Sequence, residues 1–84
     1  MFKNKTYDGM NNLSGKNIAK YRKEYVPKMS QRMLADKLQL IGIDLDKNAV
    51  QRIECGKRFV TDIELIAFAK VLNKNINELL LDVL

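Results

Sequence analysis

The chain has no histidine or tryptophan, one cysteine and one proline among its 84 residues. A single cysteine excludes a disulfide framework within the chain, and without histidine a structural zinc site lacks its usual ligands. No glycine-rich phosphate loop is present, and few side chains suited to acid–base or nucleophilic catalysis remain, so we expect neither an enzyme nor a cofactor. No apolar run approaches the ~20 residues that span a bilayer. The basic N-terminus lacks the apolar segment of a signal peptide, and we therefore expect a cytoplasmic protein.

The composition is that of one small folded domain. Apolar residues make up 46% of the chain and charged residues 30%, which is typical of a soluble globular protein. The net charge of +5 is uneven: residues 1–58 carry 13 Lys and Arg against 6 Asp and Glu, whereas residues 59–84 carry 2 against 4. A basic first two-thirds favours contact with a polyanion, although a solvated basic surface explains the charge equally well.

A repeated pattern marks the expected helix starts. An apolar residue precedes a polar capping residue, and a second apolar residue follows four positions after the cap, as in a hydrophobic staple. The four matches are Leu13-Ser14 with Ile18, Met29-Ser30 with Leu34, Leu45-Asp46 with Val50, and Val60-Thr61 with Leu65. Thr61 with Glu64 and Asn75 with Glu78 also have the spacing of capping boxes, so Asn75 marks a fifth start.

The apolar spacing between these starts is helical throughout. Expected stops are Pro27, Gly42, Gly56 and Asn73. We therefore predict an all-α fold, a compact domain of five helices near 14–25, 31–41, 47–54, 62–72 and 76–83. Residues 1–12 show no helical period and are predicted to form a flexible arm, which leaves 13–84 as the domain.

The third expected helix carries the most informative side chains. With Val50 and Ile53 facing inward, its sides and outer face bear four hydrogen-bonding residues suited to base edges in the major groove: Lys47, Asn48, Gln51 and Arg52. Lys57 and Arg58 follow the terminating glycine and are predicted to contact phosphates. Gln31 opens the second helix, where its amide is also predicted to hold a phosphate. The alternative is a solvated polar helix face without a specific ligand.

These segments together resemble the phage-repressor-like (Xre/Cro-type) helix-turn-helix family. The resemblance covers about residues 13–81 and rests on Asn17-Ile18-x-x-x-Arg22-Lys23, Ser30-Gln31-x-x-Leu34-Ala35, Val50-x-Arg52-Ile53-Glu54-x-Gly56-Lys57-Arg58, Leu65-x-x-x-Ala69-Lys70-x-Leu72 and Asn77-Glu78-Leu79-Leu80. It implies a transcriptional regulator, with repression favoured, that binds double-stranded DNA as a homodimer, at least on a two-fold operator. It also implies that Arg22 and Glu54 form a partly buried ion pair that ties the first helix to the reading helix. The alternative is a solvated pair at the edge of both helices.

Two loops are longer than in the family's compact form. One is the connector through Gly42 between the second and third helices, and the other is the stretch around Pro27 after the first. Added loop length has a small entropic cost, so we expect the reading helix to form but its register to depend on the connector.

Three features of the sequence each allow two functional interpretations. Cys55 has no companion cysteine or histidine, which favours a free thiol over a redox switch. The apolar stripe from Leu79 to Leu84 either closes the core or forms a dimer interface. An antitoxin-like or otherwise partner-controlled interaction module that also binds DNA is the alternative function, because the short chain has no room for a sensor domain of its own. RNA binding is disfavoured because no aromatic platform accompanies the basic face.

Overall fold

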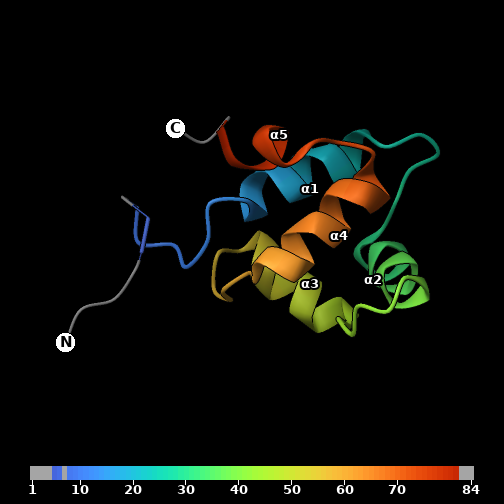
Figure 1. The fold of residues 1–84 in the computed structure, drawn as a ribbon, viewed down its shortest axis with the longest axis horizontal. Helices are drawn as coiled ribbons and strands as arrows, with labels where there is room; N and C mark the ends of the chain where they lie inside the picture. Colours follow the sequence, from blue (N-terminus) through green and yellow to red (C-terminus); the bar gives the residue numbers. More distant parts are fainter. Residues whose placement is uncertain (1–4, 7, 82–84) are drawn as a thin grey trace.

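The computed structural model describes residues 5, 6 and 8–81, and these residues contain five helices and no strand. The helices are α1 (Gly15–Glu24), α2 (Gln31–Leu40), α3 (Lys47–Glu54), α4 (Asp62–Leu72) and α5 (Ile76–Leu80). They pack around one core (Figure 1). The predicted all-α fold with five helices is therefore confirmed, although α5 is shorter than predicted within the described residues; residues 82–84 lie outside them.

Polar side chains start four of the helices as predicted. Ser30, Asp46, Thr61 and Asn75 each accept a hydrogen bond from the backbone N–H three residues later. At α4 and α5 the glutamate of the third helical position closes the capping box. These caps supply partners for N–H groups that a helix cannot satisfy itself, so the helix starts are encoded locally.

The predicted cap of α1 is wrong. Ser14 already has a helical backbone and its side chain makes no capping hydrogen bond. Instead Asn12 accepts from the N–H of Gly15 through its Oδ1 at 2.7 Å, and Leu13 is partly exposed. The Nδ2 of Asn12 donates to the carbonyls of Ile53 and Arg58, and these two bonds hold Asn12 in position to cap α1.

Three helices end in the same C-terminal capping motif, with a residue in the left-handed conformation. After α2 the N–H groups of Gly42 and Ile43 donate back to Gln39 and Leu38, and after α3 those of Gly56 and Lys57 donate to Ile53 and Arg52. Gly42 and Gly56 have φ of +88° and +78°, as this Schellman motif requires. Asn73 takes the same left-handed position after α4, at φ +56°. The predicted stops at these residues are confirmed.

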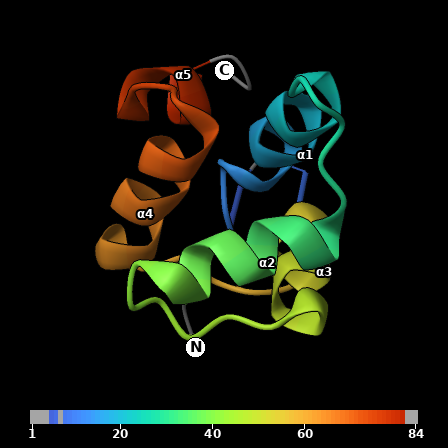
Figure 2. The ribbon, with the colours of Figure 1, turned by 90° about the vertical axis from the view of Figure 1, so that its right-hand side faces the viewer.

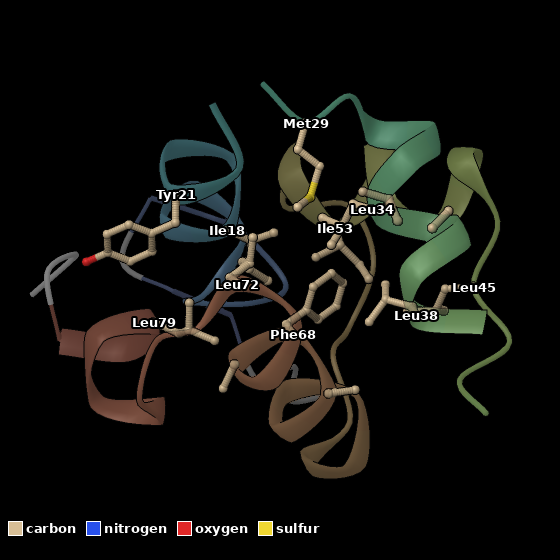
Figure 3. Packing of buried hydrophobic residues seen from close by; sticks show 14 of the residues in the cluster. Ile18, Tyr21, Met29, Leu34, Leu38, Leu45, Ile53, Phe68, Leu72 and Leu79 are labelled. Carbon is tan, nitrogen blue, oxygen red and sulfur yellow. The ribbon is translucent and has the colours of Figure 1, made fainter. Parts of the chain in front are cut away.

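The core is formed by the inward faces of all five helices and by Leu45 of the α2–α3 connector. Figure 3 shows the ring of Phe68 from α4 among side chains of the other helices, and Phe68, Ile18, Leu34, Leu38, Ile53 and Leu79 are fully buried. Met29, in the loop before α2, is buried in the same core. Asn17 of α1 donates to the carbonyl of Leu79 at 3.0 Å, which fixes the short α5 on α1.

Candidate nucleic-acid interface

The helix α3 lies at one edge of the bundle and packs on α1 and α2 (Figure 2). Its inward positions Ala49, Val50 and Ile53 are buried. The four predicted base-reading residues, Lys47, Asn48, Gln51 and Arg52, are all exposed. The amphipathic pattern read from the sequence therefore holds, and the structure presents these four side chains on the solvent side of one helix.

The N-terminal end of α3 is fixed by the residues directly before it. Asp46 Oδ1 accepts from the N–H of Ala49 at 2.8 Å, and Leu45 is buried in the core. The Nε2 of Gln39, near the end of α2, donates to the carbonyl of Leu45 at 3.1 Å. The long connector is thus attached at both ends, and Lys47 and Asn48 follow at once in the first turn of α3.

The C-terminal end of α3 is fixed by an ion pair. Arg22 of α1 donates to both carboxylate oxygens of Glu54, from Nε to Oε2 at 2.7 Å and from Nη2 to Oε1 at 3.0 Å. The two side chains are only 11% and 7% exposed, so water screens the pair weakly. Arg22 Nη1 also donates to the carbonyl of Met29, at 3.1 Å. The partly buried pair is present, and the solvated alternative does not apply.

Gln31 belongs to the same network. Its Nε2 donates to Glu54 Oε1 at 2.9 Å, so its amide is held beside the end of α3. One N–H of this amide is used internally and the second is left for another acceptor. No local sequence pattern indicates this contact, because it joins residues 23 positions apart.

Residues of the predicted flexible arm lie against the turn after α3. Asn12 Nδ2 donates to the carbonyls of Ile53 at 3.0 Å and Arg58 at 2.7 Å, while its Oδ1 caps α1. Asn11 donates to the carbonyls of Gly56 and Lys57. The adjoining side chain of Met10 contacts Gly56 closely. These described residues are therefore bound to the bundle, and together they hold the segment that carries the predicted phosphate contacts.

Gly15 shows how closely α1 approaches α3. A Cβ atom at this position would lie 2.0 Å from the carbonyl oxygen of Ile53 and 2.7 Å from Asn12 Oδ1. Only glycine allows the first turn of α1 to meet the last turn of α3 at this distance.

The two basic residues after Gly56 differ in their surroundings. Lys57 is exposed, and no ion pair involves it within the described residues. Arg58 instead forms a bidentate pair with Glu64 of α4, at 2.9 and 3.1 Å, and donates to the carbonyl of Phe59 at 2.9 Å. Its hydrogen bonds lower the pKa of the Glu64 carboxyl, and Glu64 in turn raises the pKa of Arg58. Arg58, predicted to contact phosphate, therefore has a structural partner within the fold.

The structure also shows the exposure of Cys55 and of the apolar stripe of the last helix. Cys55 is exposed and free. In the apolar stripe of the last helix, Leu79 is fully buried, Leu80 is half-buried and Leu81 is exposed, while Val83 and Leu84 lie outside the described residues. Within residues 5, 6 and 8–81 no cluster of His, Cys, Asp or Glu is arranged to hold a metal ion. In the same part of the chain, every helix is too short or too polar to cross a bilayer.

Comparison of the chain with protein-family models, with curated proteins and with solved structures gave no match.

Proposed function

We propose that this protein is a sequence-specific, DNA-binding transcriptional regulator of the phage-repressor-like (Xre/Cro-type) helix-turn-helix kind, with α3 as the reading helix. The observation that supports it best is the combination of four exposed hydrogen-bonding side chains on α3 with a helix that is fixed at both ends. Arg and Lys suit guanine and Asn and Gln suit adenine, but base reading requires that the helix carrying them be held in one orientation.

The surroundings of each residue favour a division of roles. Lys47, Asn48, Gln51 and Arg52 contact base edges. Lys57 contacts phosphate, since it is exposed on a turn that Asn11 and Asn12 hold. Gln31 contacts phosphate through the N–H that Glu54 leaves free. Arg58 contributes less, because Glu64 competes for its guanidinium.

Selection of bound duplexes from a random pool, at two salt concentrations, tests the proposal. We expect a two-fold motif with half-sites ~34 Å apart, recovered at both salt concentrations. Binding without any motif, lost steeply as salt rises, would reduce the interaction to nonspecific contact with a polyanion and contradict the proposal.

Two alanine variants test the division of roles. Arg52→Ala should cost ~1–3 kcal/mol on the selected site and relax preference at one base position, whereas Lys57→Ala should weaken binding to all duplexes alike. Lys23→Ala removes the same charge from an exposed position on α1 and serves as the control. Equal losses on specific and random duplex for both variants would contradict the assignment.

A further inference from the structure

The outward side of α4 is not covered by any part of the chain that the structure describes. The helix packs on α1, α2 and α5 through buried Ala67, Phe68, Ala69 and Leu72. Both views show α4 at the surface of the bundle with no helix outside it (Figures 1 and 2). The outward-facing residues of α4 therefore form part of the protein surface.

That side is apolar in its middle and charged at its ends. Ile63 and Ile66 are 67% and 46% exposed. Asp62 and Lys70 are exposed at the two ends, and neither forms an ion pair within residues 5, 6 and 8–81. Asp62, Ile63, Ile66 and Lys70 follow helical spacing, so they form one stripe, which we call the α4 stripe.

The α4 stripe is complementary to a copy of itself in the antiparallel direction. Asp62 and Lys70 each lie four residues from Ile66, which is ~6 Å along the axis on either side. If two such helices cross at Ile66 about a two-fold axis, Asp62 of each copy meets Lys70 of the other. The same operation places the isoleucines against one another at the centre. A parallel arrangement would instead oppose like charges.

We propose that the α4 stripe is a homodimer interface, formed with a second copy of this chain in the antiparallel orientation. This surface differs from the apolar stripe of the last helix, for which a dimer interface is one of two interpretations and where Leu79 closes the core and is not accessible. The inference concerns assembly alone and does not depend on the proposed DNA binding.

The exposed apolar area predicts a weak dimer. Ile63 and Ile66 together expose roughly 200 Å² per copy, well below the ~800 Å² that each partner of a standard complex buries. Association in the micromolar range or weaker follows, since the polar rim adds little affinity. The concentration range of the experiment must therefore extend to hundreds of micromolar.

Sedimentation equilibrium without DNA tests the apolar centre. The full chain should show a concentration-dependent monomer–dimer equilibrium, and Ile66→Glu should raise the dimer Kd at least tenfold. Leu40→Glu is the matched control, because Leu40 is an 85% exposed leucine at the end of α2, outside the stripe, and its replacement should leave the Kd within twofold. Circular dichroism and thermal melting establish that each variant is folded.

Charge reversal tests the orientation. Asp62→Lys and Lys70→Asp should each weaken self-association several-fold, most clearly at low salt, because each opposes like charges twice. Mixing the two variants should restore association, since every contact then joins opposite charges. The double variant Asp62→Lys/Lys70→Asp should also dimerise on its own. This pattern does not arise from a local effect on helix stability.

Three outcomes would overturn the inference. One is a monomer at every concentration, in which case the stripe is free or meets a different protein. Another is a dimer that Ile66→Glu leaves intact, which places the interface elsewhere. The third is a pair of charge variants that fail to associate when mixed, which excludes the antiparallel arrangement. Each result stands whether or not the chain binds DNA.

Discussion

The two ends of α3 are held in different ways. At the N-terminal end the contacts come from the immediately preceding residues, Asp46 and Leu45, with Gln39 from the end of α2. At the C-terminal end they come from distant segments: Arg22 of α1, Gln31 of α2 and Asn12 before α1. One end is fixed by a local cap and a connector, and the other by a polar network that spans the chain.

This difference separates two properties of the proposed reading helix. The local cap determines where the helix begins and hence which residues stand in its first turn. The network determines how the helix axis is oriented against the bundle, because Arg22 and Glu54 join two helices through a nearly buried pair. Changes at the C-terminal end should therefore affect stability most, and those at the N-terminal end should be smaller and more local.

The largest effect is expected from Glu54→Gln. It leaves Arg22 without its carboxylate in a site of low exposure, so the free energy of unfolding should fall by about 3 kcal/mol. DNA affinity should fall as well, since the orientation of α3 is lost. Urea denaturation and duplex titration measure the two effects. Glu24→Gln changes an exposed glutamate of α1 and should alter stability by less than about 0.5 kcal/mol. If Glu54→Gln leaves both quantities unchanged, the network does not hold the helix.

Gly15→Ala should be destabilising by about 2 kcal/mol, because the added Cβ overlaps the carbonyl of Ile53. The direction of this change in stability is informative. Alanine in place of glycine within a helix ordinarily stabilises by about 1 kcal/mol. Thermal melting of the variant beside Lys23→Ala, at an exposed position of the same helix, measures the effect. A variant that melts above the parent protein would show that α1 and α3 are not in close contact.

At the other end, Asp46→Ala should cost about 1 kcal/mol through loss of the cap. Asp46→Asn keeps a capping side chain and should be close to neutral. We expect hydrogen exchange of the alanine variant to increase at the first turn of α3 and not at its last. Faster exchange at both ends would mean that the two ends of α3 are not held independently.

The smallest effect concerns the ion pair of the linker after α3. The pKa of Glu64 is lowered chiefly by its hydrogen bonds from Arg58, so the pair stabilises the fold above the glutamate pKa of the unfolded chain. That contribution is lost as the pH falls through the lowered pKa. Glu64→Gln keeps a capping side chain but removes the pair, and should cost less than about 1 kcal/mol at pH 7.

The difference between Glu64→Gln and the parent protein should shrink below about pH 4, which urea denaturation at several pH values measures. If the difference in stability stayed constant down to pH 2, protonation of Glu64 would not account for the loss of the ion pair's contribution in acid. Asp8, whose pKa is lowered to about 2 mainly by its hydrogen bond from Lys16, adds to the acid sensitivity of both proteins equally.

Much of the fold could be predicted from short stretches of sequence. Four caps, two capping boxes and the stops at Gly42, Gly56 and Asn73 depend on residues within a few positions of one another, so a single sequence shows them. The inward faces of the helices follow from their periodicity. The family resemblance predicts the pair of Arg22 and Glu54, whereas the spacing within each helix places the two charges but does not show that they meet.

The rest of the site depends on contacts between distant residues. Asn12 bonds to residues 41 and 46 positions away, and nothing at Asn12 itself distinguishes it from Ser14 as a cap. Gln31 and Arg58 were predicted to face phosphate because they are polar residues at a helix start and after a turn. Their internal partners, Glu54 and Glu64, depend on how the helices pack, which local pattern does not determine.

The three bonds of Asn12 also bear on where this domain can be cut. A fragment that starts at Leu13 retains the sequence of every helix, yet it exposes the carbonyls of Ile53 and Arg58 and leaves the N–H of Gly15 without its acceptor. The minimal folding unit therefore includes Asn12, and Asn11 with it. Fusions and truncations near the N-terminus that alter Asn11 or Asn12 therefore act directly on the C-terminal end of α3.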